Sequence, residues 1–330
     1  MHATGSQAPG AIAERGRAGW KLSFVIPCYN EGPNIRLLHS ELTRAIVGLA
    51  DDYEIIFVDD GSRDATLAEI RAVRAGDARV AYLSFSRNFG HEAASTAGLC
   101  HASGDAVVLM DADLQDPPET LAEMVRYWRE GYDVVAAQRR EREGENALKK
   151  AGSMGFYRLL MRLSAVEMPL DTGDFRLMDR RVVEAFKRMP EYHRFVRGMI
   201  AWLGFRQVLV SFDRRPRRAG DTKYGLRSLF GLSVTAISGF SVLPLRLATL
   251  LGTIAMLASI ALAGIIVYQR IVLGMLVEGY AFMMVAILGL GAVQLLVLGI
   301  VGEYVGKIYS QTQRRPLYVI AESAGVAAKD

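Results

Sequence analysis

Residues 106–118 read AVVLMDADLQDPP, an apolar run of strand type that ends in acidic and amide side chains. A strand over 106–110 would deliver Asp111 and Asp113 into the following loop, and at a spacing of two residues both side chains of an extended segment point the same way. Converging oxygen ligands suit Mg²⁺ or Mn²⁺, which usually stays bound to substrate phosphates. The pair alone is a weak signal, because acidic pairs also cap loops.

Strand and helix signals alternate on both sides of this stretch. We expect further strands at 22–26, 53–58, 80–85 and 133–137, the first of them ended by Pro27, and helices over 30–48, from 64, up to 103 and over 118–130. This alternation predicts an α/β protein whose mostly parallel sheet is covered on both faces. Such sheets bind ligands outside the carboxyl ends of their strands. Polar clusters fall at those ends, at residues 29–31, 59–60, 87–88 and 111–115.

The last hundred residues carry much of the apolar composition, which reaches 51% over the 330-residue chain. Residues 247–268 and 280–301 are two runs of 22 residues without Asp, Glu, Lys or Arg. As helices each would be about 33 Å long, enough to cross a hydrocarbon core of about 30 Å. Buried core helices are the alternative, but unbroken apolar runs of this length favour membrane spans.

Basic residues flank these two apolar runs, at Arg227, Arg246, Lys307, Arg314 and Arg315. By the positive-inside rule both termini and the soluble body face the cytoplasm. The same flanks explain the net charge of +4 better than nucleic-acid binding does. The expected organisation is a disordered lead-in (1–19), an α/β domain (20–225), an interfacial amphipathic helix (226–246), a first membrane helix (247–268), an external loop (269–279), a second membrane helix (280–301) and a cytoplasmic tail (302–330).

Several motifs occur in the order known from one enzyme family. They are VIPCYNE (25–31), VDDGS (58–62), SRNFG (86–90) and MDADLQDPPE (110–119), followed by TGDFRL (172–177), RRAGDTKY (217–224) and GEYVGKIY (302–309). The first four resemble family 2 glycosyltransferases of GT-A fold. With the last three and two C-terminal spans, the chain resembles polyprenyl-phosphate glycosyltransferases, the group of dolichyl-phosphate mannose synthase and its bacterial bactoprenol-phosphate glucosyltransferase relatives.

This resemblance implies a function and a location. The enzyme would transfer a hexose, with inversion, from a nucleotide sugar to a membrane polyprenyl phosphate such as undecaprenyl phosphate, and would lie in the bacterial inner membrane. UDP-glucose is the favoured donor, because RREREGE (139–145) and TGDFRL lean towards the glucosyltransferase branch. GDP-mannose and an aminopentose donor remain open. Relatives of this type also suggest a homo-oligomer.

The resemblance also implies roles for individual residues. The nucleotide sugar would be held by Pro27, Tyr29, Glu31, Asp60, Asp111, Ala112 and Asp113. The metal ion, Mg²⁺ or Mn²⁺, would be held by Asp111, Asp113 and Gln115. The catalytic residues would be Asp113, Arg139, Arg217 and Lys223, and the acceptor phosphate would meet Arg139, Arg142, Lys149 or Lys223. The family often has Lys after Asn-Phe-Gly, where this chain has His91.

Some of these residues have a structural alternative. Asp59 is expected to cap the turn before the helix at residue 64, which leaves the base contact to Asp60. Glu31 could serve only the N-terminus of a helix. Asp171 and Asp174 either position an acceptor loop or satisfy backbone amides.

The implied chemistry depends on cations more than on a general base. The nucleophile would be a phosphate oxygen, which is already ionised at neutral pH, whereas the leaving diphosphate needs its charge neutralised. A processive polysaccharide synthase would carry a Q-x-x-R-W motif, which residues 313–316 (QRRP) do not supply. A non-catalytic membrane scaffold is opposed by the intact Asp111, Asp113, Gln115 and Lys223.

Overall fold

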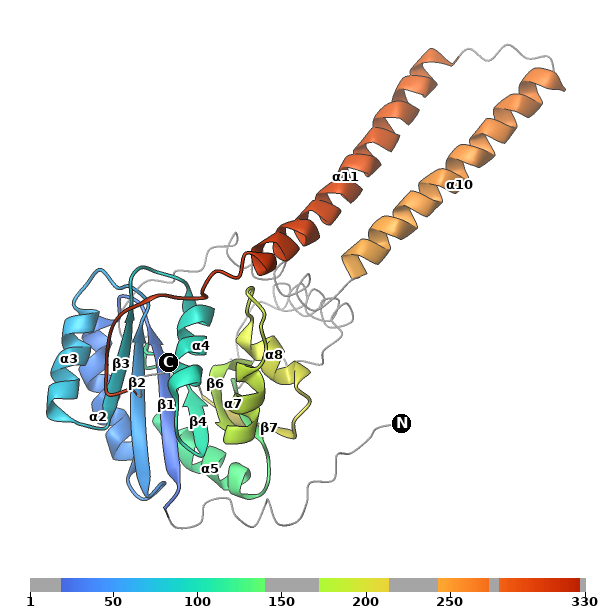
Figure 1. Ribbon diagram of the computed structural model, residues 1–330. Helices are drawn as coiled ribbons and strands as arrows, with labels where there is room; N and C mark the ends of the chain where they lie inside the picture. The colour runs from blue at the N-terminus through green and yellow to red at the C-terminus, as the bar shows by residue number, and fades with distance from the viewer. Residues whose placement is uncertain (1–18, 140–171, 214–242, 273–278, 327–330) are drawn as a thin grey trace. The chain divides into compact units, whose positions relative to one another are not determined.

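The computed structural model describes residues 19–139, 172–213, 243–272 and 279–326. The chain divides into two units, one built on a β-sheet and the other containing two long helices (Figure 1). Among the residues predicted for the site, Arg142, Lys149, Arg217 and Lys223 lie outside the described residues, as does most of the expected interfacial helix.

Within the described residues, eight strands form one sheet in the order β7-β5-β6-β4-β1-β2-β3-β8. Their bounds are β1 (Lys21–Cys28), β2 (Asp52–Asp59), β3 (Val80–Phe85), β4 (Ala106–Leu109), β5 (Val134–Arg139), β6 (Thr172–Asp179), β7 (Gln207–Phe212) and β8 (Ile320–Ala324). β6 and β8 run antiparallel to their neighbours, and the other strand pairs are parallel. The predicted mostly parallel α/β fold is therefore confirmed.

Helices cover both faces of this sheet. They are α2 (Gly32–Ile46), α3 (Thr66–Gly76), α4 (His91–His101), the short 3₁₀ helix η1 (Pro118–Thr120), α5 (Leu121–Arg129), α7 (Arg180–Lys187) and α8 (Val196–Trp202). α2, α3 and α5 contribute to one continuous core with the sheet. α4 packs on the opposite face, where it contacts α7 and α8.

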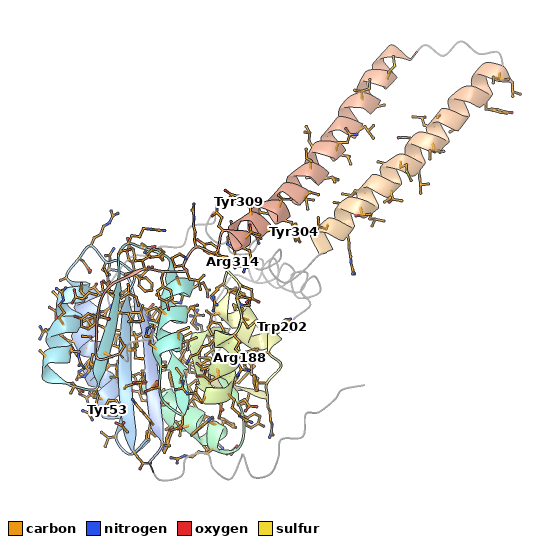
Figure 2. All side chains as sticks on the ribbon, in the orientation of Figure 1. Tyr53, Arg188, Trp202, Tyr304, Tyr309 and Arg314 are labelled. Carbon is orange, nitrogen blue, oxygen red and sulfur yellow. The ribbon has the colours of Figure 1, made fainter. Side chains whose placement is uncertain are left out.

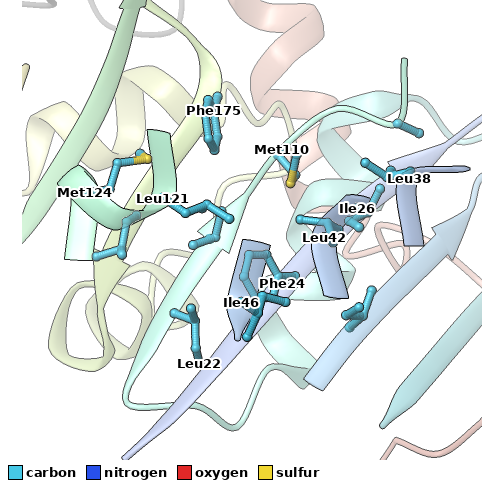
Figure 3. Packing of buried hydrophobic residues seen from close by; sticks show 14 of the residues in the cluster. Leu22, Phe24, Ile26, Leu38, Leu42, Ile46, Met110, Leu121, Met124 and Phe175 are labelled. Carbon is cyan, nitrogen blue, oxygen red and sulfur yellow. The ribbon is translucent and has the colours of Figure 1, made fainter. Parts of the chain in front are cut away.

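The main core lies between β1 and α2. Leu22, Phe24 and Ile26 alternate along β1 and are fully buried. They meet an apolar stripe of α2 that includes Leu38 and Leu42, at the spacing that places side chains on one helical face (Figure 3). Burial of each such side chain contributes about 2 kcal/mol relative to exposure. This contact therefore holds α2 against β1.

On the other face, small residues let α4 approach the sheet closely. A Cβ added at Gly98 would lie 2.2 Å from Cγ1 of Val25 and 3.2 Å from Cγ2 of Val58. Only a residue without a side chain fits there. The close packing holds α4 directly against β1 and β2, and so fixes the position of its first residue, His91, near the ends of the strands.

The prediction that Pro27 ends the first strand is wrong. β1 continues to Cys28, and Pro27 is paired with Val58 of β2. On its other side β1 pairs with β4 only as far as Val25. Proline lacks an N–H group that could donate a hydrogen bond. Beyond Val25, no residue of β4 is paired with β1, so Pro27 leaves no hydrogen bond between these strands unmade.

The second unit contains α10 (Leu243–Ile271) and α11 (Tyr280–Thr312), which include the two predicted spans. Large apolar side chains such as Leu250, Ile254 and Ile260 are 54–61% exposed. Figure 2 shows such side chains standing out along both helices. A soluble protein rarely exposes an apolar surface of this extent. Both helices are long and apolar enough to cross a membrane, and their exposure argues against core helices.

The sequence analysis did not predict β8, which follows α11. β8 pairs antiparallel with β3 at one edge of the sheet. Its Glu322 carboxylate accepts hydrogen bonds from the guanidinium of Arg71 and the hydroxyl of Tyr82. Just before β8, the ring of Tyr318 stacks on Phe85 with centroids 5.0 Å apart. The chain after the second apolar helix is therefore part of the sheet-bearing unit.

Candidate active site

The carboxyl ends of the parallel strands β1 to β5 meet at one edge of the sheet. β6 begins at the same edge, because it runs antiparallel to both β4 and β5. The register places Cys28 opposite Asp59, and Asp59 opposite Ser84. The polar clusters predicted from the sequence therefore lie at a common edge, as expected for the ligand-binding side of such a sheet.

The loops after β2 and β3 are joined through Asp60. Its carboxylate accepts hydrogen bonds from the backbone N–H of Phe89, at 2.6 Å, and of Gly90, at 2.9 Å. Asp59 accepts from the N–H of Ser62 at 3.0 Å, which is the turn-capping role expected for it. Asp60 thus shapes the loop that leads into α4, and its contact with a base stays a prediction.

Gly61 makes this loop junction possible. Its φ of +67° lies in the left-handed region, which residues with a side chain rarely adopt. A Cβ at this position would lie 2.4 Å from the backbone carbon of Arg87 and 2.8 Å from the N of Asn88. The VDDGS and SRNFG motifs therefore meet backbone to backbone.

The loop after β1 is fastened to the same region. The N–H of Glu31 donates to Oγ1 of Thr66, at 2.8 Å, and its carboxylate accepts from the side chain of Asn34, at 2.7 Å. Glu31 occupies the N-cap position of α2, which agrees with the helix-terminus alternative. Pro27 and Tyr29 lie at the same strand end, and their roles in donor binding stay predictions.

The acidic loop after β4 differs in one respect from the expectation. Ala112 and Asp113 lie in a turn rather than in an extended segment, because β4 already ends at Leu109. Leu114 is buried with a φ of +61°, an uncommon conformation for a residue with a side chain. This turn lets Asp113 accept a hydrogen bond from the N–H of Gln115 at 3.2 Å. The turn, rather than strand alternation, sets the direction of the two carboxylates.

Three carboxylates share this loop, since Asp116 accepts from the N–H of Asp111 at 3.3 Å. Burial raises the pKa of both Asp111 and Asp116, and charge repulsion from nearby carboxylates raises it further. Such crowding is relieved by a divalent cation. Asp111, Asp113 and Gln115 offer only hard oxygen ligands, a donor set that fits Mg²⁺ or Mn²⁺. The sequence analysis did not select Asp116, although it stands inside the DADLQDPP run.

Arg139 ends β5 at the same edge. Its buried Nε has no hydrogen-bond partner among the described residues. A Cβ added at Gly173 would lie 3.4 Å from its Nη2, so the guanidinium passes close to the backbone of β6. A buried N–H without a partner is uncommon. The role of Arg139 as a phosphate ligand stays a prediction.

His91 lies between two carboxylates. Its Nε2 is 3.0 Å from Asp174 Oδ2 and 3.9 Å from Asp111 Oδ1. Arg197 Nε lies 2.9 Å from the other oxygen of Asp174. Burial lowers the pKa of His91, but the hydrogen bond to Asp174 and the charge of Asp111 outweigh it and raise the pKa to about 9. Burial likewise raises the pKa of Asp174, yet His91 and Arg197 hold it well below its usual range.

Most of this charged cluster is not predicted from the sequence. The roles of His91 and Asp174 stay open there, and Glu92, Arg176 and Arg197 are not among the predicted site residues. No local motif marks Arg197, which lies in a helix that was not predicted. The ligand atoms of His91, Asp111 and Asp174 lie within 4.8 Å of one another, a spacing that could also hold a metal ion.

Comparison with known proteins identifies related chains. Residues 23–186 match the family described as Glycosyl transferase family 2. An uncharacterized glycosyltransferase of Synechocystis sp. is 46% identical over 93% of this chain and 96% of its own length. A protein of Shigella phage SfII named bactoprenol glucosyl transferase is 39% identical over 92% of this chain and 98% of its own length. Among solved structures, glucosyl-3-phosphoglycerate synthase from Mycobacterium tuberculosis is 24% identical, with a TM-score of 0.45 over 71% of this chain and 82% of its own.

Proposed function

Because the chain belongs to glycosyl transferase family 2 and is of the polyprenyl-phosphate glycosyltransferase type, we propose that it transfers glucose from UDP-glucose to a polyprenyl phosphate. The observation that carries the proposal is the meeting, at one sheet edge, of the acidic loop and Arg139, whose buried Nε has no hydrogen-bond partner within the part of the chain that the structure describes. The two exposed apolar helices support a lipid acceptor. The relatives named bactoprenol glucosyl transferase support both glucose and such an acceptor.

The reaction would be a single displacement at the anomeric carbon. An oxygen of the acceptor phosphate forms a bond to that carbon while the bond to the diphosphate oxygen breaks, and the diphosphate leaves with the electron pair. Because the phosphate is ionised at neutral pH, no proton has to be removed. Asp174 agrees with this scheme, because His91 and Arg197 hold its pKa well below the usual range and so make it a weak base.

Residues of the edge would then supply binding and charge. Asp111, Asp113 and Gln115 would hold a divalent ion, which when bound neutralises charge on the diphosphate. Arg139 would donate from its guanidinium to a phosphate of the donor or the acceptor. Arg217 and Lys223 stay predicted phosphate ligands, as do Arg142 and Lys149. Pro27, Tyr29, Glu31 and Asp60 stay predicted contacts for the nucleoside.

We also propose that both ends of the helix pair lie on the cytoplasmic side of the bacterial inner membrane. The basic flanks support this orientation. β8 gives independent support, because seven residues separate it from the end of α11 and β8 belongs to the same unit as β1. Two spans that start from and return to one unit leave both ends on one side. A homo-oligomer stays a prediction.

The test uses the full-length protein in detergent or in vesicles containing undecaprenyl phosphate. With Mn²⁺ and UDP-glucose labelled in the sugar, we expect label to move into a chloroform-soluble product that mild acid hydrolyses. EDTA should stop the transfer, and Mg²⁺ or Mn²⁺ should restore it. UDP-xylose, GDP-mannose and an aminopentose donor run in parallel identify the sugar.

Other outcomes decide between the alternatives. Label in an insoluble polymer would indicate a processive synthase. Nucleotide binding without transfer to any acceptor would indicate a scaffold with a degenerate site. Label in the lipid only with GDP-mannose would keep the reaction class and replace the donor.

A further inference from the structure

His91 is one member of a closed ring of contacts. Its imidazole contacts Asp174 of β6 at 3.0 Å, and Asp174 contacts Arg197 of α8 at 2.9 Å. The residue before Arg197, Val196, donates its N–H to the carboxylate of Glu92 at 2.8 Å. Glu92 follows His91 on α4, so the ring closes through two peptide links. Three elements that are distant in sequence are thereby fixed to one another at the site edge.

This ring is connected to the acidic loop through His91. Nε2 of His91 faces Asp111 Oδ1 at 3.9 Å as well as Asp174. At 3.0 Å the carboxylate of Asp174 is within hydrogen-bond distance of Nε2, whereas Asp111, at 3.9 Å, meets the same nitrogen through charge alone. Asp174 therefore sets the position of the imidazole, and Asp111 lies next to the same Nε2.

The same atoms could be read as a metal site, but their surroundings argue otherwise. A dication among His91, Asp111 and Asp174 would sit beside the guanidinium of Arg197, which already contacts Asp174. The buried guanidinium of Arg176 adds a second positive charge near Asp174. Like charges at short range are unfavourable. We therefore keep the ion with the predicted ligands Asp111, Asp113 and Gln115.

We propose that His91 is a positioning residue of the transfer reaction: supported by Asp174 and Arg197, it fixes the carboxylate of Asp111 so that the metal-binding loop is preset for the donor diphosphate. The proposal rests on the proposed function for its reaction. Groups that orient a metal ligand in this way typically change metal affinity about 10–100-fold when they are removed. A single ring nitrogen, Nε2, serves both carboxylates in this role.

The test measures Mn²⁺ binding by the decrease in the free-ion electron paramagnetic resonance signal, with UDP present and no lipid. For His91→Ala we expect about a 10–100-fold weaker Mn²⁺ affinity, with an equal rise in the Mn²⁺ concentration that half-saturates transfer and a smaller change in kcat. His91→Gln, which keeps an N–H donor at a similar reach, should recover most of the affinity. His101→Ala is the matched control, because His101 lies at the other end of α4 and contacts the Ala97 carbonyl oxygen.

A double-mutant cycle tests the ring itself. Asp174→Asn should weaken Mn²⁺ binding about as much as His91→Ala does. The double variant should bind Mn²⁺ no more weakly than the weaker-binding of the two single variants, because both changes release the carboxylate of Asp111. Wild-type Mn²⁺ affinity in His91→Ala, or additive losses in the double variant, would overturn the proposal. Loss of all Mn²⁺ binding in His91→Gln would overturn it too, since His91 would then be a ligand.

The outcomes also separate this inference from the proposed function. Mn²⁺ binding that follows the expected pattern, without transfer to lipid, would reject only the lipid acceptor. A wild-type protein that binds no Mn²⁺ with UDP would reject both.

Discussion

The two halves of the sheet edge hold their carboxylates in different ways. After β2, Asp60 accepts hydrogen bonds from backbone amides of the next loop, and Asp59 accepts from the N–H of Ser62 and the hydroxyl of Ser84. In β6, Asp174 instead contacts the charged side chains of His91 and Arg197. Backbone amides cannot be moved without unfolding a turn, whereas side-chain cations depend on helices packed from elsewhere. We call the β2–β3 half the frame, because backbone hydrogen bonds fix its carboxylates. In the β4–β6 half, a change of a single side chain can alter the surroundings of Asp174.

Asp113→Ala should give the largest effect, because it removes a predicted metal ligand. We expect transfer to fall about 1000-fold or more, measured as label in the chloroform-soluble product. Thermal unfolding and insertion into membranes should stay close to wild type. Near-normal turnover would remove Asp113 from the metal site.

Asp174→Asn should give the next largest effect, because it leaves Arg197 and His91 without the anion that they share. We expect a loss of about 3 kcal/mol in the free energy of unfolding near pH 6, measured by denaturant unfolding in detergent.

The pH dependence of that loss follows from the two pKa shifts. Asp174 has a lowered pKa, so its contribution is present above the unfolded value of about 3.9 and is lost as the pH falls through the lower folded value. His91 has a raised pKa, so its contribution is full below about 6.5 and is lost as the pH rises through about 9. The gap between wild type and Asp174→Asn should therefore narrow both in acid and above pH 9. A gap that is constant with pH would contradict the charged network.

Gly61→Ala tests the frame. The added Cβ would collide with the backbone of Arg87 at a residue whose φ is positive. We expect a loss of about 2–3 kcal/mol in stability and weaker UDP binding, measured by calorimetry. Gly76→Ala is the control, since nothing lies within 4 Å of a Cβ there, and it should be neutral or slightly stabilising.

Tyr318→Ala should have the smallest effect, because it acts at the edge of the frame. Loss of the stacking on Phe85 should cost about 1 kcal/mol, measured as the free energy of unfolding. Tyr318→Phe keeps the ring and should match wild type. Burial raises the pKa of Tyr318 to about 12. The wild-type phenol is therefore uncharged at neutral pH, and Tyr318→Phe removes no charge. Equal losses in the two variants would mean that stacking is not what holds this segment.

The contrast between the halves also explains what could be predicted from sequence. Strands β1 to β5 were predicted within a few residues, because buried parallel strands are short apolar runs. β6 was not predicted, since it carries the charged residues Asp174, Arg176 and Asp179, the last two of them buried. β8 was not predicted either, because IAESA has few apolar residues and owes its pairing to β3.

Within the site, local and distant contacts differ in the same way. Asp59 caps a turn three residues away, and a short motif is enough to predict that role. His91 meets Asp174 across 83 positions, and Glu92 meets Val196 across 104. Such pairs follow from how helices pack, which a single sequence does not reveal. Arg142, Lys149, Arg217 and Lys223 lie outside the described residues, so their predicted roles stay untested.

The pairing of β8 with β3 has a consequence for how the protein is made. The ribosome adds residues 320–324 only after both apolar helices have been synthesised, whereas β3 is complete when a quarter of the chain exists. Domains commonly fold during synthesis. Each nascent chain therefore passes through an interval in which β3 offers an open strand edge, the part of a sheet that pairs most readily with foreign chains. Synthesis of residues 320–324, rather than completion of strands β1 to β5, ends that exposure.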